Sequence, residues 1–132
     1  MVRNGDILLR LREPNYAVYI DNDYKGLIYP PHIVRIRVFG DRVNACFLAM
    51  YLNSTMVKKQ LQGGALAGTQ ISMIKVSDVN SIEICLPSLE KQKMIVEYSK
   101  LSSKELQLLQ RLMAEKSKLS KQVFEKLVEI GE

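Results

Sequence analysis

The sequence is poor in the residues that build metal sites, disulfide scaffolds and aromatic cores. It has no tryptophan, one histidine (His32) and two cysteines (Cys46 and Cys85) among 132 residues. The cysteines are far apart and neither belongs to a Cys-x-x-Cys motif, which excludes a zinc knuckle and a disulfide framework. A single histidine cannot supply a His-based metal cluster, and it makes a Ser-His-Asp triad very strained. We therefore expect no metal and no cofactor, and we interpret His32 as a structural surface histidine.

Long apolar runs and catalytic motifs are missing as well. No run approaches the roughly 20 apolar residues that span a bilayer, and the start of the chain has no signal-peptide hydrophobic stretch. The glycine-rich residues 63–69 superficially resemble a phosphate loop but lack its Lys-Ser/Thr ending. Aspartates and glutamates show no spacing that would gather two carboxylates around magnesium. We expect a soluble, cytoplasmic protein that is not an enzyme.

What the sequence does have is a modest basic excess with an uneven choice of bases. Nineteen lysines and arginines against fourteen acidic residues give a net charge of +5, which permits a polyanionic partner without requiring one. Arginines crowd the first third of the chain, whereas every base after Pro87 except Arg111 is lysine. Arginine offers a donor fork suited to phosphates and guanine edges, whereas lysine mostly solvates a helix surface. Two interpretations of these arginines stay open: they contact a nucleic acid, or they form an ordinary solvent-exposed surface.

In the first part of the chain, the pattern of apolar and polar residues is typical of β-strands. Predicted strands cover residues 6–12, 16–20 and 33–38. The third alternates cleanly, with Val34, Ile36 and Val38 on one face and Arg35 and Arg37 on the other. This pattern predicts a half-buried strand whose polar face carries two arginines.

From Asn44 onward the period becomes helical. Asn44 is a plausible N-cap, and a second short helix is expected after Ser54. The glycine-rich residues 63–68 are a predicted loop, and residues 71–76 and 82–86 are β-rich runs. We predict an α+β fold with a small mixed domain over residues 1–87.

Residues 88–132 are expected to form one long helix that makes coiled-coil contacts. No glycine or proline occurs between Pro87 and Gly131, the composition favours helix, and Ser88 can cap the start. A heptad register with additional leucines predicts a pairing face made of Leu101, Leu106, Leu109, Leu112, Met113, Leu119, Val123, Leu127 and Ile130, together with Leu108. Lys116 and Ser120 interrupt this face, where they either choose the register or tolerate exposure.

Two further features of residues 1–87 allow two interpretations each. Tyrosines among basic residues can grip nucleic acid, but tyrosine also suits half-buried strands. We favour the strand interpretation for Tyr16 and Tyr19 and leave Tyr24 open, because it follows a turn. The loop at 63–68 is either a flexible connector or a backbone that approaches a partner closely.

The order of these features resembles a known family. The chain opens with Gly5-Asp6-Ile7-Leu8-Leu9, and an alternating strand precedes the stretch from Asn44 to Ser54. The stretch from Ile82 to Gln92 contains Leu-Pro-x-Leu-x-x-Gln, followed by the long helix. This order is similar to the specificity (S) subunit of type I restriction-modification systems, in its target-recognition domain and spacer helix.

The resemblance implies a non-catalytic subunit that reads double-stranded DNA sequence-specifically and positions methyltransferase and endonuclease subunits. Full S subunits carry two recognition domains joined by two antiparallel helices, whereas this chain has one unit and starts later than the family pattern. We therefore expect a half S subunit, truncated at its N-terminal side, that forms a homodimer through residues 92–130. The alternative is a truncated S-like protein that pairs through its helix with S or methyltransferase subunits without binding DNA itself.

The candidate DNA contacts are chosen for their chemistry, because recognition domains vary too much for base-reading residues to be carried over. The aromatic and basic candidates of the first part are Arg10, Arg12, Tyr24, Lys25, Arg35 and Arg37. The candidates around the second short helix and the glycine-rich loop are Lys58, Lys59, Gln62, Thr69 and Gln70. Glutamine is included because its side chain can read adenine with two hydrogen bonds.

Overall fold

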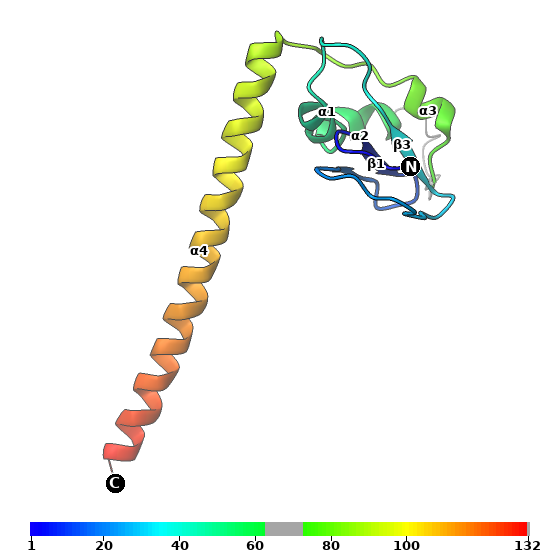
Figure 1. The fold of residues 1–132 in the computed structure, drawn as a ribbon. Helices are drawn as coiled ribbons and strands as arrows, with labels where there is room; N and C mark the ends of the chain where they lie inside the picture. The colour runs from blue at the N-terminus through cyan, green and yellow to red at the C-terminus, as the bar shows by residue number, and fades with distance from the viewer. Residues whose placement is uncertain (63–72, 132) are drawn as a thin grey trace. The chain divides into compact units, whose positions relative to one another are not determined.

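The computed structural model describes residues 1–62 and 73–131. By its internal contacts the chain divides into two compact units, Met1–Ile95 and Val96–Glu132. The first unit contains the sheet, the short helices and the first turns of the long helix, whereas the second contains the remainder of that helix (Figure 1). The predicted α+β fold, a small mixed domain followed by a long C-terminal helix, is confirmed.

A three-stranded antiparallel sheet with the order β2-β1-β3 forms the base of the first unit. Its strands are β1 (Ile7–Arg10), β2 (Tyr16–Tyr19) and β3 (Ile33–Ile36), each shorter than the sequence pattern predicted. Ile7 and Leu9 of the central strand β1 are buried, as is Ala17 of β2. Because residues paired across strands share a face, the register Leu9↔Ala17 and Leu9↔Val34 places these side chains together on the core face.

Two helices cover the core. Helix α1 (Ala45–Leu52) begins at Asn44, whose side chain accepts a hydrogen bond from the Phe47 amide at 3.1 Å, which confirms the predicted N-cap. Helix α2 (Thr55–Gln62) follows two residues later and buries Val57. Helix α1 packs on both β2 and α2, so the helical pair closes the apolar side of the sheet.

The two β-rich runs of the sequence do not become strands in the described residues. Residues 71–72 lie outside the described residues, and Met73 makes only an isolated bridge with Arg12. Helix α3 (Val76–Asn80) then forms between the two runs. The prediction of a strand at 82–86 was wrong. Among the described residues, the backbone of this segment bonds to side chains and not to another strand. The Glu83 amide and carbonyl bond to the Gln60 side chain at 2.8 Å each.

Helix α4 (Leu89–Ile130) confirms the predicted long helix. Ser88 caps its start, since its hydroxyl oxygen accepts the Lys91 amide at 3.3 Å. Within residues 1–62 and 73–131, no helix has the length and apolar character required to cross a membrane.

Candidate nucleic-acid interface

The outer face of the sheet carries two of the predicted arginine contacts. In the β-register, Arg10 lies opposite Tyr16 on one side and Ile33 on the other, and Leu8 lies opposite Arg35. Because side chains alternate along a strand, Arg10, Tyr16 and Arg35 all lie on the face opposite the core. Tyr16 is 59% exposed and Arg35 is exposed as well. The sheet therefore brings two arginines and a tyrosine together on its outer face, where Arg10 is half-buried.

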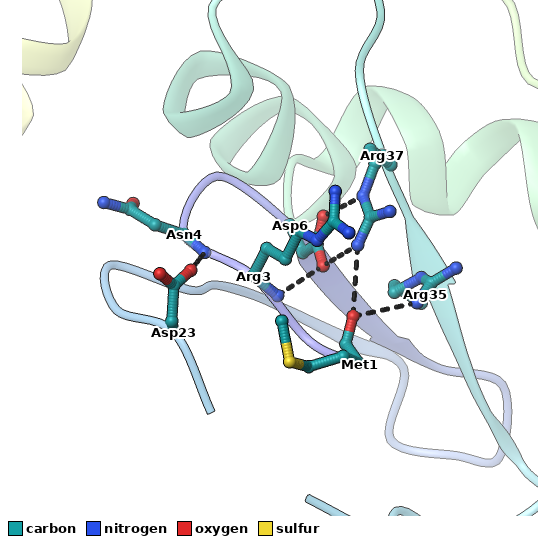
Figure 2. Close-up of polar contacts among 7 residues, drawn as sticks. All are labelled: Met1, Arg3, Asn4, Asp6, Asp23, Arg35 and Arg37. Carbon is teal, nitrogen blue, oxygen red and sulfur yellow. Dashed lines mark hydrogen bonds and ion pairs between the residues drawn. The ribbon is translucent and has the colours of Figure 1, made fainter. Parts of the chain in front are cut away.

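Arg37 has a different environment from Arg35, although the sequence pattern grouped the two. Arg37 lies just past the end of β3, and its guanidinium forms a bidentate ion pair with the carboxylate of Asp6. Nε donates to one carboxylate oxygen at 2.7 Å and Nη2 donates to the other at 2.8 Å. Figure 2 shows this pair facing the start of the chain. Asp6 is 1% exposed and the Arg37 side chain is 26% exposed, so the pair is largely withdrawn from solvent.

The ion pair explains how a carboxylate can be buried at this position. Hydrogen bonding from Arg37 lowers the pKa of Asp6 from 3.8 to about 2, although burial of the carboxyl group opposes the shift. The Arg3 amide also donates to Asp6, at 2.8 Å, and lowers the pKa further. The same contact with Asp6 raises the pKa of Arg37. Both groups are therefore charged at neutral pH.

The network extends to the first residue of the chain. The Met1 carbonyl accepts hydrogen bonds from Arg35 Nη1 at 3.1 Å and Arg37 Nη2 at 3.2 Å (Figure 2). The Asn4 amide donates to Asp23 at 2.8 Å. The N-terminal segment is thus held against β3 by arginine side chains, and Arg35 keeps an exposed side chain while doing so.

The remaining predicted contacts are spread over several elements. Tyr24 is 43% exposed and forms an isolated bridge with Val2, and the adjacent Lys25 is exposed. Arg12, just beyond β1, is also exposed. Arg12, Tyr24 and Lys25 therefore lie outside the paired strand residues that include Arg10 and Arg35.

The second group of predicted contacts centres on α2. Lys58 and Lys59 are exposed on this helix, and Gln62 is its last residue. Thr69 and Gln70 lie outside the described residues. The structure therefore places the two lysines in solvent and leaves the predicted glutamine contacts as predictions.

Sequence reasoning missed the role of three carboxamide side chains, which act as partners for distant backbone groups. Asn53, the C-cap of α1, accepts the Ala17 amide and donates to the Ala17 carbonyl, at 2.8 Å each. Gln60 makes the same pair of bonds with Glu83. Each carboxamide thus bonds to both the amide and the carbonyl of one residue, as a neighbouring β-strand would. The only sequence signal was a polar residue next to an apolar helical run, which is also typical of ordinary surface positions.

Gln92 is the most buried of these carboxamides and has the most distant partners. Its side chain is fully buried. Its Oε1 accepts the Asn44 amide at 2.8 Å, and its Nε2 donates to the carbonyls of Arg42 at 3.1 Å and Pro87 at 2.9 Å. The glutamine of the Leu-Pro-x-Leu-x-x-Gln stretch therefore ties the first turn of α4 to the N-terminus of α1.

Beyond Val96, which is buried, helix α4 has the opposite character, because its large apolar side chains are exposed. All the residues of the predicted pairing face are exposed, from 49% at Leu109 and Val123 to 80% at Ile130. An apolar surface of this extent on a helix is typical of a protein interaction site. Among the described residues, no group of three histidines, cysteines, aspartates or glutamates could hold a metal ion.

Comparisons with known proteins agree with this architecture. A family model described as "Type I restriction modification DNA specificity domain" matches residues 2–115. The crystal structure of the HsdS subunit from Thermoanaerobacter tengcongensis is similar, with a TM-score of 0.71 and 26% sequence identity. The match covers 86% of this chain but only 30% of that one. A search of curated proteins found no match.

The family match extends over most of the chain and includes the sheet, the short helices and more than half of α4. It confirms the resemblance drawn from the order of motifs. The specificity subunit is the non-catalytic part of a type I complex, in agreement with the expectation that this chain is not an enzyme. The chain belongs to the type I restriction-modification DNA specificity family.

Proposed function

We propose that this chain is a half S subunit that recognises a DNA sequence through the outer face of its sheet and positions methyltransferase and endonuclease subunits there. The observation that carries the proposal is the grouping of half-buried Arg10 with exposed Tyr16 and Arg35 on the outer face of the sheet. Arginine forks bind phosphates and guanine edges, and an exposed tyrosine adds a hydroxyl donor or a stacking surface. Membership of the specificity family supports a DNA target-recognition role.

Arg35, in β3, and Arg37, just past its end, have separate roles in this proposal. Arg35 contacts DNA, because its side chain is exposed and, among the described residues, bonds through one nitrogen to Met1. Arg37 positions the segment that carries Arg35, because two of its nitrogens bond to Asp6. We retain the other contact residues as proposals of the same kind. They are Arg12, Tyr24, Lys25, Lys58, Lys59, Gln62, Thr69 and Gln70.

A salt titration of duplex binding tests the proposal. Each lost phosphate contact reduces the slope of log K against log salt by about 0.9. We expect Arg35→Ala to reduce the slope by about 1, and the double variant with Arg10→Ala to reduce it by about 2. Arg111→Ala on α4 is a matched arginine control that leaves the slope unchanged. Unchanged slopes for Arg35→Ala and the double variant, with native circular dichroism, would remove the sheet face from the DNA interface.

Helix α4 supplies the second part of the proposed function. A homodimer that pairs antiparallel through residues 92–130 buries both apolar faces and gives two recognition units related by a two-fold axis. The exposure of these side chains supports the pairing. Sedimentation of the full chain at micromolar concentration is expected to give the mass of a dimer, and a monomer mass contradicts this part of the proposal.

The exposed face of α4 also favours a second candidate, an S-like interaction protein without DNA affinity. In that case α4 pairs with an S or methyltransferase subunit and modulates its assembly. A pull-down with purified S and methyltransferase subunits, with and without duplex DNA, separates the two functions. A partner retained without DNA, together with no mobility shift of any duplex, favours this second candidate.

A further inference from the structure

The exposed face of α4 contains two opposite charges in line with its apolar residues. Glu105 and Lys116 are eleven residues apart, and eleven residues make slightly more than three turns of an α-helix. They therefore lie on one side of the helix, about 16 Å apart along its axis. Both are exposed, and Leu109 and Leu112 lie between them on the same side, 49% and 65% exposed.

This side of α4 follows an eleven-residue repeat with steps of four, three and four residues. The repeat runs over Met94, Tyr98, Leu101, Glu105, Leu109, Leu112, Lys116, Ser120, Val123 and Leu127. At 100° per residue all ten fall within about 100° of the helix circumference. The apolar members are between 49% and 74% exposed. The row is thus a continuous stripe, which we call the α4 stripe, interrupted by one acid, one base and one serine.

The order of residues in the α4 stripe is symmetric about its centre. In an antiparallel pair of identical helices whose axis passes between Gln110 and Arg111, position i faces position 221 − i of the second copy. Glu105 then faces Lys116, and Leu109 faces Leu112. Outward from there the facing pairs are Leu101 with Ser120, Tyr98 with Val123, and Met94 with Leu127. Apart from the charged pair and the pair of Leu101 with Ser120, both residues of every facing pair are apolar.

From this symmetry we infer that Glu105 and Lys116 select the register and direction in which α4 pairs with a second copy of this chain. The inference rests on the homodimer proposed above and names the residues that specify it. Two-fold symmetry makes each contact twice, so one register forms two Glu105–Lys116 ion pairs within an otherwise apolar seam. A charged pair in such a seam specifies alignment at some cost in stability.

The alternative alignments place like charges together. Parallel pairing in register sets Glu105 against Glu105 and Lys116 against Lys116. Sliding the antiparallel pair by one repeat in either direction brings two copies of Glu105, or two copies of Lys116, face to face at the axis. Like charges at these positions disfavour all three arrangements. The central antiparallel register is the one of these four in which both charges meet an opposite charge.

Charge reversal on the full-length chain tests this inference, with sedimentation equilibrium giving the dimer dissociation constant. We expect E105K and K116E each to raise that constant by about tenfold or more, because each variant replaces two ion pairs by two like-charge contacts. The double variant E105K/K116E restores opposite charges and is expected to return to within about threefold of the native value. An equimolar mixture of the two single variants should form a heterodimer tighter than either homodimer.

Lys104 and Glu115 provide a matched control. They are also eleven residues apart and oppositely charged, but they lie about 100° around the helix from the middle of the α4 stripe. K104E and E115K are expected to change the dissociation constant by less than about twofold. Circular dichroism of every variant verifies that α4 remains helical.

The outcomes separate the register from the dimer itself. A native dimer whose dissociation constant is unaffected by E105K and K116E overturns the inference but leaves the homodimer intact. A native chain that stays monomeric at 100 µM overturns both. Single variants that weaken the dimer without recovery in E105K/K116E also contradict direct facing of the two residues.

Discussion

The two units of this chain treat their chemical groups in opposite ways. In Met1–Ile95, apolar side chains such as Ile7 are fully buried, and even the Gln92 side chain is buried, where it donates two hydrogen bonds and accepts one. In Val96–Glu132, large apolar side chains such as Leu112 and Met113 are 65% and 72% exposed. Hydrophobic burial is the dominant favourable contribution to folding. The first unit therefore holds a core of its own, whereas the second has apolar surface that only association can bury.

The largest expected difference comes from deleting one apolar side chain in each unit. Ile7→Ala removes a side chain that is 0% exposed and is expected to cost about 2–5 kcal/mol of unfolding free energy. Leu112→Ala removes one that is 65% exposed and is expected to change the stability of the first unit by less than about 0.5 kcal/mol. Urea denaturation at a concentration where the chain is monomeric measures both. Equal losses would show that α4 is part of the same core.

Gln92→Leu is expected to have the next largest effect. The substitution keeps an apolar stem but leaves the Asn44 amide and the carbonyls of Arg42 and Pro87 without their partner. Unpaired buried groups of this kind cost about 1–3 kcal/mol each, and partial access of water reduces the total. We expect a loss of about 2–4 kcal/mol with faster hydrogen exchange at the Asn44 amide. Gln92→Glu keeps the acceptor for that amide and should protect it better than leucine does.

The Asp6–Arg37 ion pair makes stability depend on acid pH. The pKa of Asp6 is about 2 in the folded chain, against 3.8 for an aspartate without these contacts. As the pH falls, the unfolded state therefore binds a proton before the folded state does. The stabilisation is therefore complete above about pH 4 and is lost as the pH falls from there towards 2. Asp6→Asn should lower stability at neutral pH and remove this part of the acid dependence. Denaturation of the native chain and of Asp6→Asn at pH 7, 4 and 2 measures both effects, with Asp41→Asn as an exposed control.

Sequence patterns predicted the elements whose determinants are local. The alternation at 33–36 placed Arg35 on the outer face, as the β-register confirms, because side-chain direction in a strand depends only on a period of two. The N-cap at Asn44 and the long run without glycine or proline before Gly131 were equally local, and both helices form. The pattern extended this strand to residue 38, whereas β3 ends at Ile36. The bond from Arg37 to Asp6 spans 31 positions, so no local period indicates it.

Features that depend on distant partners were not predictable from the same patterns. The β-rich run at 82–86 pairs with no strand among residues 1–62 and 73–131, and Gln60, 23 positions away, pairs with its backbone instead. Asn53 reaches across 36 positions to Ala17, and Gln92 reaches across 48 to Asn44. A carboxamide serves equally well on a surface or against a peptide group, so its type alone does not predict which of these roles it has.

The smallest expected effect compares one hydrogen-bonding pattern in two settings. Asn53 and Gln60 each bond to the amide and the carbonyl of a single residue, but Ala17 is 3% exposed whereas Gln60 and Glu83 are exposed. We expect Asn53→Ala to cost about 1–2 kcal/mol and Gln60→Ala less than about 0.5 kcal/mol, because water replaces the lost partner only at the exposed site. Thermal unfolding of the two variants measures this difference. Comparable losses would mean that residues 82–86 need Gln60 to stay in place, and that exposure is then a poor guide to which carboxamides hold the first unit together.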